Sequence, residues 1–409
     1  MNKLENLIQK KCPNGVEYKK LKDVLQSVKT GLNPRQNFKL NTYDAENYYV
    51  TVKEFTTGKI IFSDKTDKIN DEAVKVIQNR SNLGKGDVLF SGIGTIGKVA
   101  VVDIETDNWN CSESVFLLKP NREIITSKFL KYEMESGYVQ KIINSTSVGS
   151  TLKGVRKETL LNIKIPIPPI EVQDEIVRIL DNFTELTAEL TAELTARQKQ
   201  YEYYRNKLLS FDESAESLDT LHTHTHTHGY FYGQEIKWLA LSEVLIIKNG
   251  KDYKHLSEGK YPVYGTGGVM TYVNKFAYDQ PSVLIPRKGS LNKVYYVEEP
   301  FWNVDTIYYT IIDSNIVIPK YIYYILSNMH LEKLNIAGGI PSLTQSTLYK
   351  LKIPVPTLEA QEKIINILDK FDKLTNDISE GLPAEIEARQ KHYEYYRNKL
   401  LSFKELKTA

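Results

Sequence analysis

One stretch of this chain occurs twice with almost no change. Residues 196–213 read ARQKQYEYYRNKLLSFDE, and residues 388–405 read ARQKHYEYYRNKLLSFKE. A second matched pair lies upstream, IPIPPIEVQDEIVRILDNF at 165–183 and IPVPTLEAQEKIINILDKF at 353–371. A long internal repeat of this kind indicates that the chain is built from two similar units, each ending in long helical segments.

The repeat also extends through the regions before the helices. Residues 28–31 (VKTG) correspond to residues 247–250 (IKNG). Between these positions and the helices lie short β-branched and aromatic runs separated by turn residues, which predict strands. Helices are expected at 127–136, with Ser127 as N-cap, and at 319–327, with Pro319 in the first turn. Each half is therefore predicted to be an α+β domain that leads into a long helix.

The first long helix has a mainly apolar seam at alternating spacings of four and three, weakened at Thr187 and Arg197, which is typical of a coiled coil. The positions are Ile176, Leu180, Phe183, Thr187, Leu190, Leu194, Arg197, Tyr201, Tyr204, Leu208 and Phe211. The alternative is an amphipathic helix lying on a globular core, but the matching copy favours helix pairing. In the second helix Gly381 and Pro383 predict a break at 379–383, because an interior proline costs about 3 kcal/mol.

The first helix contains the Thr-Ala-Glu-Leu repeat TELTAELTAELTA at 184–196. The matched ends of the two helices differ in separation by four residues, which adds about 6 Å to a helix and keeps its period to within about 40°. This segment can therefore lengthen or shorten without unfolding, as a spacer would.

Composition excludes several classes of protein. The chain has 409 residues, enough for two cores, and 41% hydrophobic and 25% charged residues are ordinary values. It has no apolar run of membrane-spanning length and no apolar signal region at the N-terminus. Two cysteines are too few for a disulfide framework, so a cytoplasmic location is expected. A net charge of +2 is weak for a protein that binds nucleic acid alone.

Two motifs suggest chemistry that their context does not support. Residues 92–97 match GxGxxG, but the strand-like KVAVVD follows where a nucleotide site needs a helix. We interpret this run, and the aligned 286–293, as strand–turn–strand tips; an ordinary hairpin turn and a DNA-contacting loop remain alternatives. His222, His224, His226 and His228 alternate with threonines and are interpreted as a low-complexity linker rather than a metal site. We recognise no catalytic motif and predict no metal site.

Polar residues that suit base edges and phosphates gather near the predicted turns of both halves. In the first half they are Arg80, Lys85, Ser91, Thr95, Lys98, Asn110 and Ser112. In the second half they are Thr266, Arg287, Lys288, Ser290, Asn292, Lys293, Asn303 and Asp305. Taken singly, each is more readily a surface turn residue; as groups they suggest DNA binding.

The layout resembles the specificity subunit of type I restriction-modification enzymes. The resemblance rests on the two ARQKxYEYYRNKLLSF segments, the IPxPxxExQxxIxxILDxF leaders, the TAEL repeats, and the runs YPVYGTGGVMTYV and FWNVDTIYY. It implies an α+β fold with two target-recognition domains of mixed α/β structure, separated by two long helices that form an antiparallel coiled coil. The implied domains are 1–164 (first recognition domain), 165–213 (first helical spacer), 214–229 (linker), 230–352 (second recognition domain) and 353–409 (second helical spacer).

The resemblance also implies a function. Each recognition domain would read one half of a bipartite, asymmetric site on double-stranded DNA, and the spacer would set the gap. The subunit would be non-catalytic and would join two methylation subunits, which use S-adenosylmethionine, and restriction subunits, which use ATP and Mg²⁺. The residues expected to bind these partners are Tyr201, Tyr204, Arg205, Leu208, Tyr393, Tyr396, Arg397 and Leu400. The competing hypotheses are a coiled-coil scaffold with two protein-binding domains, and a nuclease or methyltransferase in its own right.

Overall fold

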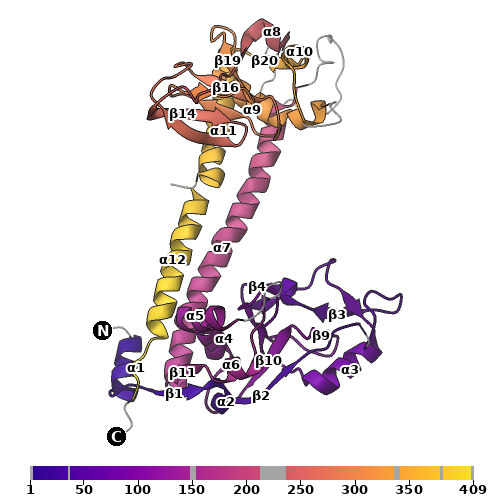
Figure 1. Ribbon diagram of the computed structural model, residues 1–409, viewed down its shortest axis with the longest axis vertical. Helices are drawn as coiled ribbons and strands as arrows, with labels where there is room; N and C mark the ends of the chain where they lie inside the picture. Colours follow the sequence, from indigo (N-terminus) through magenta and orange to yellow (C-terminus); the bar gives the residue numbers. More distant parts are fainter. Residues whose placement is uncertain are drawn as a thin grey trace, which may run out of the picture. The chain divides into compact units, whose positions relative to one another are not determined.

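The chain forms two compact units that share one long helix. The computed structural model describes residues 3–35, 37–147, 153–211, 236–335, 341–377 and 381–406. Unit 1 comprises Met1–Thr191 and Glu385–Ala409, and unit 2 comprises Ala192–Ala384. Helix α7 (Ile170–Leu209) contributes its first half to unit 1 and its second half to unit 2 (Figure 1).

Unit 1 is built on a four-stranded antiparallel sheet in the order β2-β10-β7-β8. Its strands are β2 (Leu25–Thr30), β7 (Val88–Ser91), β8 (Val99–Val101) and β10 (Val115–Pro120). The smaller sheets use β1 (Glu17–Lys20), β3 (Asn47–Val50), β4 (Phe55–Thr56), β5 (Lys59–Ile60), β6 (Lys68–Ile69), β9 (Trp109–Cys111) and β11 (Lys164–Ile167). The shorter helices are α1 (Lys3–Lys11), α2 (Leu21–Val24), α3 (Asp71–Ser81), α4 (Ser127–Glu135), α5 (Gly137–Thr146) and α6 (Lys157–Leu161).

Unit 2 repeats this plan, with a four-stranded sheet in the order β13-β19-β16-β17. Its strands are β12 (Lys237–Ala240), β13 (Leu245–Asn249), β14 (Glu258–Gly265), β15 (Gly268–Val273), β16 (Ser282–Pro286), β17 (Tyr295–Val297), β18 (Trp302–Asn303), β19 (Ile307–Ile312) and β20 (Lys352–Val355). Its helices are α8 (Leu241–Val244), α9 (Pro319–Asn328), α10 (Gln345–Tyr349) and α11 (Leu358–Asn376). The predicted strand-rich α+β halves are confirmed.

The correspondence between the units extends to structural details that the sequence repeat does not reveal. Each unit has a three-stranded sheet, β6-β3-β9 in unit 1 and β15-β14-β18 in unit 2. In both, the central strand pairs in parallel with a tryptophan-bearing strand, Tyr48 opposite Trp109 and Val263 opposite Trp302. Gly31 and Gly250 each lie where a Cβ would meet the backbone of that region, within 1.5 Å of the Cys111 carbonyl oxygen and 2.1 Å of the Val304 carbonyl oxygen. Only glycine permits this approach, so the repeated glycine has a structural cause.

The units differ in what is attached to the shared frame. Unit 1 carries helix α3 and the short β4–β5 hairpin, whereas unit 2 carries the longer β14–β15 hairpin. Figure 1 shows α3 beside β3 and β9 in unit 1, and β14 near β16 in unit 2. The same frame therefore presents different surfaces in the two units.

A buried glutamine ties the start of each long helix to its domain. In unit 1, Gln173 Nε2 donates to the carbonyl oxygens of Ile124 and Pro168, both at 2.8 Å, and its Oε1 accepts from Thr126 N at 2.9 Å. In unit 2, Gln361 makes the same three bonds, to Ile316 O at 3.1 Å, Pro356 O at 2.9 Å and Ile318 N at 2.8 Å. Both side chains are fully buried, and these bonds satisfy backbone groups that burial would otherwise leave unpaired.

An aspartate about two turns further along repeats this pattern. Asp181 accepts from Lys128 Nζ and Tyr132 Oη, both at 2.6 Å, and Asp369 accepts from Lys320 Nζ at 2.8 Å and Tyr324 Oη at 2.5 Å. These bonds fix α4 onto α7 and α9 onto α11. They also establish the residue-by-residue register between the two halves.

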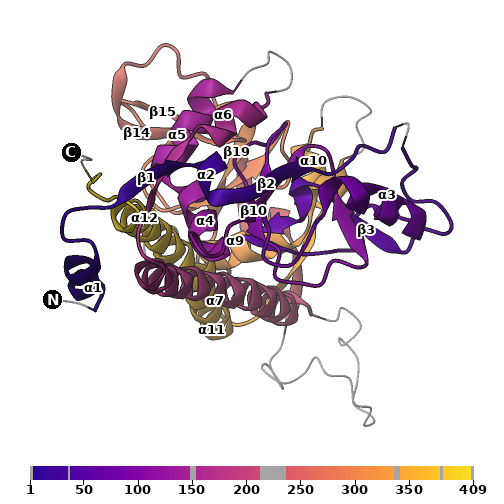
Figure 2. The same cartoon turned by 90° about the horizontal axis from the view of Figure 1, so that it is seen from below.

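Each unit is closed by the C-terminal helical segment of the other half. In unit 1, Phe183 from the first half stacks on Tyr396 from helix α12 (Leu382–Leu400) of the second half, with ring centroids 5.6 Å apart. In unit 2, Phe371 stacks on Tyr204, with centroids 5.5 Å apart. Within unit 1, α12 lies alongside the first half of α7 and runs in the opposite direction (Figures 1 and 2). The expected antiparallel pairing of helices is confirmed there.

Every position of the predicted seam within α7 is buried or half-buried. Ile176, Leu180 and Leu208 are buried, and the positions between them are half-buried, whereas most flanking residues are exposed. Thr187 interrupts the apolar row, and its hydroxyl donates to the Phe183 carbonyl oxygen at 2.8 Å. This internal bond allows a threonine to lie on the seam without an unpaired hydroxyl.

The predicted break in the second helical segment is also confirmed. Helix α11 ends at Asn376 and α12 begins at Leu382, one residue earlier than Pro383. Gly381 lies against the end of α11, where a Cβ would come within 2.5 Å of the Lys373 carbonyl oxygen. The proline is accommodated in the first turn, where its missing N–H costs nothing.

One predicted cap is wrong. The N-cap of α4 is Thr126, whose side chain accepts from Phe129 N, and Ser127 is the first residue of the helix. Ser127 Oγ instead donates to the Gly86 carbonyl oxygen at 2.6 Å. Two adjacent hydroxyl residues offered equal local signals, and the tertiary contact with Gly86 decided between them.

Replacing either buried glutamine should loosen its own unit only. We expect Gln173→Ala to destabilise unit 1 by about 2–4 kcal/mol, because three buried backbone groups lose their partners. Hydrogen–deuterium exchange of the full chain should rise around residues 124–130 for Gln173→Ala, and around 316–322 for the matched Gln361→Ala. Equal effects of both variants on both regions would contradict this assignment.

Candidate nucleic-acid interface

The β7–β8 turn of unit 1 is a tight strand–turn–strand tip. Val88 pairs with Val101 and Phe90 with Val99, and Ser91 Oγ accepts from Lys98 N at 2.8 Å. Gly94 and Gly97 have φ values of +78° and +90°, a region that favours glycine. Strand β8 follows the glycines, so the GxGxxG run is a hairpin tip and not a nucleotide loop, as its context predicted.

Unit 2 has the same tip between β16 and β17. Gly289, aligned with Gly94, has φ +86°. Each glycine N–H donates to a second loop, Gly94 to the Lys153 carbonyl oxygen at 2.9 Å and Gly289 to the Pro341 carbonyl oxygen at 3.0 Å. The two tips are therefore equivalent in position and in support, while their side chains differ.

The predicted residues of the first half lie at opposite ends of the main sheet. Thr95 and Lys98 are exposed on the β7–β8 tip. Arg80 is also exposed, and it donates to Thr30 Oγ1 at 3.4 Å. Because Thr30 pairs with Phe116, Arg80 lies at the same end of the sheet as this tip. Lys85 precedes β7 and is therefore at the other end, where it pairs with Glu105 at 2.7 Å. Arg80, Thr95 and Lys98 form one candidate surface, and Lys85 lies outside it.

The predicted residues of the second half come together more closely. Arg287 Nη1 donates to the Asp305 carbonyl oxygen at 3.1 Å, and Lys288 Nζ lies 3.9 Å from the Asp305 carboxylate. The Thr266 carbonyl oxygen accepts from Tyr295 Oη at 3.0 Å, which holds the β14–β15 turn beside the β16–β17 tip. Ser290, Asn292 and Lys293 are exposed on that tip. These seven residues form the candidate surface of unit 2.

Four predicted residues are buried and bonded inside their domains. Asn110 Nδ2 donates to Gln78 Oε1 at 2.8 Å, and Asn303 Nδ2 donates to the Ile307 carbonyl oxygen at 2.8 Å. Ser112 Oγ lies 2.6 Å from Ser114 Oγ, and Ser91 Oγ holds the tip as described above. Their proximity to turns in the sequence reflects a role in shaping those turns, and we leave them out of the candidate surfaces.

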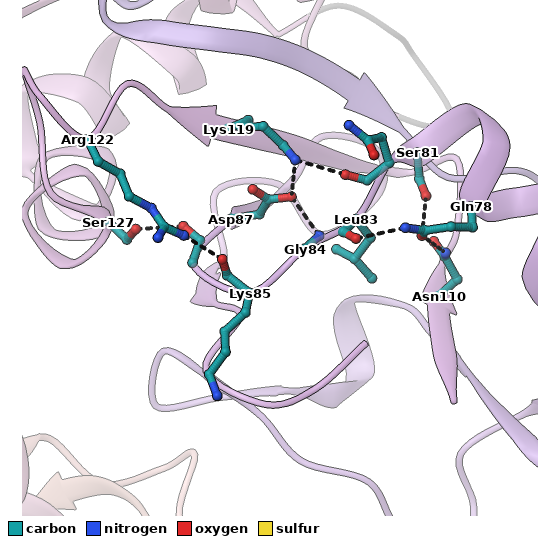
Figure 3. A network of polar contacts seen from close by, with 12 residues as sticks. Gln78, Ser81, Leu83, Gly84, Lys85, Asp87, Asn110, Lys119, Arg122 and Ser127 are labelled. Carbon is teal, nitrogen blue, oxygen red and sulfur yellow. Dashed lines mark hydrogen bonds and ion pairs between the residues drawn. The ribbon is translucent and has the colours of Figure 1, made fainter. Parts of the chain in front are cut away.

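A polar network around the turn before β7 fixes the positions of Asn110 and Lys85 (Figure 3). Gln78 Nε2 donates to the Leu83 carbonyl oxygen at 2.9 Å, and Arg122 Nη2 donates to that of Lys85 at 2.5 Å. Asp87 accepts from Gly84 N at 3.0 Å and lies 3.7 Å from Lys119 Nζ. Burial raises the pKa of the Asp87 carboxyl, and the Lys119 charge opposes that rise. The network orders the turn rather than forming an open site.

The residues expected to bind partners are largely occupied within the units. Tyr201, Tyr204 and Leu208 pack into the core of unit 2, and Tyr393 and Leu400 pack into that of unit 1. Arg205 stacks over Tyr201 and Arg397 over Tyr393, with centroid distances of 5.5 and 5.2 Å. Tyr396 stacks on Phe183 and is partly exposed. These identical residues are explained by packing inside the two units.

The identical residues that packing does not explain lie on the opposite face. Tyr203 and Tyr395 are each 60% exposed, and each has a lysine one turn later, with Lys207 Nζ and Lys399 Nζ 5.8 and 5.9 Å from the ring centroids. These two tyrosines are not among the partner-binding residues that the sequence predicted. The sequence does contain a signal for them, because they lie off the apolar seam and are still identical in the two copies.

Among the described residues there is no group of three or more His, Cys, Asp or Glu side chains that could hold an ion. His222, His224, His226 and His228 lie outside the described residues. None of the described helices is long and apolar enough to cross a membrane.

The model for the type I restriction modification DNA specificity domain matches this chain twice, at residues 13–197 and 234–388. The chain belongs to that family. The resemblance seen in the sequence is thereby confirmed, and each match covers one of the two strand-rich domains with part of the helical segment that follows it.

Relatives and solved structures agree with this assignment. The chain is 36% identical over 274 residues to the EcoR124I/EcoR124II specificity subunit of Escherichia coli, which covers 60% of this chain and 65% of that one. It is 37% identical over 273 residues to a putative type I specificity subunit of Haemophilus influenzae, covering 60% and 66%. The chain thus spans slightly less than two thirds of the length of these relatives.

The crystal structure of a type I restriction-modification S subunit from M. genitalium has the same fold. It aligns with a TM-score of 0.59 at 22% identity, over 96% of this chain and 98% of that one. The predicted fold class is therefore confirmed over nearly the whole chain.

Proposed function

We propose that this chain is the DNA-recognition subunit of a type I restriction-modification complex, in which each domain reads one half of a bipartite site. The observation that supports this most directly is the pair of equivalent hairpin tips. Both tips contain a positive-φ glycine whose N–H donates to a second loop, yet unit 1 presents Thr95 and Lys98 where unit 2 presents Ser290, Asn292 and Lys293. A shared frame with different polar tips suits the reading of two different sequences.

The proposal also covers the catalytic activity and the cellular location of the chain. We propose that it has no catalytic activity of its own. In this proposal the methylation subunits supply the S-adenosylmethionine chemistry, and the restriction subunits supply the reactions that use ATP and Mg²⁺. A cytoplasmic location follows from a function on cellular DNA. The alternative of a coiled-coil scaffold with two protein-binding domains is not favoured by membership of a DNA specificity family.

Substitutions at the two tips should affect different half-sites. We expect Lys98→Ala to weaken selection of one half-site and Lys288→Ala that of the other, each by about 5–100-fold in affinity, as for the loss of one contact worth 1–3 kcal/mol. The measurement is selection of duplexes from a random library by the full chain with its methylation subunit. Lys85→Ala is the matched control, because this exposed lysine lies at the far end of the β7–β8 hairpin, and its selection should equal that of the wild type.

The outcomes separate the hypotheses. A complex that selects no sequence at all would exclude the recognition function and favour the scaffold. Loss of both half-sites in Lys98→Ala would contradict the assignment of one half-site to each domain.

The length of α7 is proposed to set the gap between half-sites. The helix is continuous from Ile170 to Leu209, and a helix rises 1.5 Å per residue. Deleting residues 191–194 removes one TAEL unit and about 6 Å, on the order of two base-pair steps. Methylome sequencing of a strain carrying the deletion should show a shorter gap and unchanged half-sites. An unchanged gap would contradict this role for the helix.

The exposed tyrosines are proposed to dock two copies of one partner, the methylation subunit. Tyr203 lies 5.3 Å from Tyr204 at 76° and Tyr395 lies 5.3 Å from Tyr396 at 78°, so the two surfaces are alike in detail. Exposed aromatic residues with a neighbouring cation are frequent anchors of protein interfaces.

Removing one tyrosine should remove one partner. In native mass spectrometry with the methylation subunit, the wild-type chain should bind two copies, and Tyr203→Ala or Tyr395→Ala should bind one. The double variant should bind none at the same concentrations. Tyr43→Ala, which removes a fully exposed but unrepeated tyrosine, is the control and should still bind two.

A further inference from the structure

Unit 1 contains a cavity at the place where the C-terminal segment meets the first domain. Its volume is ≈ 450 Å³, within the range of small-molecule sites, about 300–1,000 Å³. The lining comes from β1, α4, α5, β11 and the segment after α12. The lining includes Tyr18, Glu133, Tyr138, Lys164, Phe403 and Glu405.

The walls of this cavity are fixed by hydrogen bonds. Tyr18 Oη donates to the Phe403 carbonyl oxygen at 2.9 Å, and Gly137 N donates to Asn398 Oδ1 at 2.8 Å. Val16 N donates to the Lys404 carbonyl oxygen at 2.9 Å. The cavity is therefore a property of the folded unit, formed where both ends of the chain meet.

Glu133 is the unusual member of the lining. It is 1% exposed, and its Oε1 has no hydrogen-bond partner in the described part of the chain. Leaving a buried carboxyl oxygen unpaired costs free energy that folds normally avoid. The stability of the fold therefore does not explain a carboxyl in this position.

The second half of the chain shows that the fold does not need this carboxyl. Tyr132 and Tyr324 make the same bond to Asp181 and Asp369, so the residue after each tyrosine is equivalent, and Glu133 corresponds to Ile325. Ile325 is buried in the core of unit 2. An apolar side chain satisfies the same frame, and the glutamate is a special feature of unit 1.

The groups around Glu133 suit a cation better than an anion. Glu405 is a second carboxylate residue on the lining, and the aromatic residues Tyr18, Tyr138 and Phe403 line the same space. Aromatic rings attract alkylammonium ions and repel anions. Lys164 is the one cation on the lining; it is exposed, and the described structure shows no ion pair between it and Glu133. Burial raises the pKa of the Glu133 carboxyl well above its usual value, because burial disfavours its charged form.

We propose that this cavity is a binding site for a small aliphatic ammonium ion, held by the Glu133 carboxylate and bordered by the rings of Tyr18, Tyr138 and Phe403. The ammonium N–H groups donate to the orphaned Glu133 oxygen, and the alkyl part fills the apolar wall. A hard metal ion fits less well, because it needs six or more oxygen ligands and the lining offers two carboxylates. Because the C-terminal segment forms part of the wall, the bound ion stabilises the contact of that segment with the first domain.

Titration of the full chain with n-butylammonium chloride tests the proposal. Isothermal calorimetry should show saturable binding, with 1-butanol as the uncharged ligand of the same shape showing at least tenfold weaker binding. The ligand should also raise the melting temperature of the wild-type chain, since it binds the folded form. Equal binding of butanol would overturn the proposal, because the cavity would then be a plain apolar site.

Two variants of Glu133 keep the test independent of folding. Glu133→Gln retains the shape without the charge, and Glu133→Ile copies the residue that the second half uses at this position. Both should lose ammonium binding at least tenfold, and Glu133→Ile should melt at or above the wild-type temperature. Unchanged binding in either variant would show that Glu133 does not hold the ion.

The pH dependence and Lys164 give two further readouts. Binding requires the carboxylate, so affinity should rise with pH by up to tenfold per unit while Glu133 is protonated in the free protein, and then level off. Lys164→Met removes the competing cation, and we expect it to tighten binding. Affinity that is independent of pH, or weaker binding in Lys164→Met, would count against the proposal.

Discussion

The fold depends on the exchange of helical ends between the two halves. Phe183 meets Tyr396 in unit 1 and Phe371 meets Tyr204 in unit 2, so each half supplies the aromatic partner that the other half lacks. Such pairs contribute about 0.5–1.5 kcal/mol beyond their burial. The constraint is reciprocal, because a change in either end segment affects the opposite domain. This explains physically why the leaders and end segments match so closely within one chain, while the domain surfaces do not.

The same exchange distinguishes the residues that the fold requires from the residues that can vary. Gln173, Asp181 and their counterparts attach each helix to a domain through bonds that involve backbone atoms or invariant partners of the repeat. In the described structure, the exposed side chains of the hairpin tips make no such bond, apart from the contact of Lys288 with Asp305 between β18 and β19. Tip residues can therefore change without loss of the frame. A recognition protein needs this combination of a rigid support and replaceable contacts.

Much of the frame was predictable from the sequence, because it follows from local signals. The heptad seam, the break at Gly381 and Pro383, and the strand–turn–strand reading of residues 92–97 all rest on periodicity or on turn chemistry. The candidate surface was predictable only in part. Asn110 and Asn303 are polar and near turns, yet both are buried, since burial depends on strands β3 and β14 that are distant in sequence. Lys85 and Lys98 are close in sequence but lie at opposite ends of one hairpin.

The modest charge of the chain follows from this arrangement of surfaces. The two candidate surfaces offer five cationic side chains, Arg80 and Lys98 in unit 1, and Arg287, Lys288 and Lys293 in unit 2. Lys288 is already paired with Asp305 at 3.9 Å. If all five contacted phosphates, the logarithm of affinity would fall with that of salt at a slope of about −4 to −5. On the proposed function, tight binding at cellular salt then requires further cations from partner subunits. A nearly neutral recognition chain is therefore consistent with a complex in which sequence is read by one subunit and much of the phosphate charge is met by others.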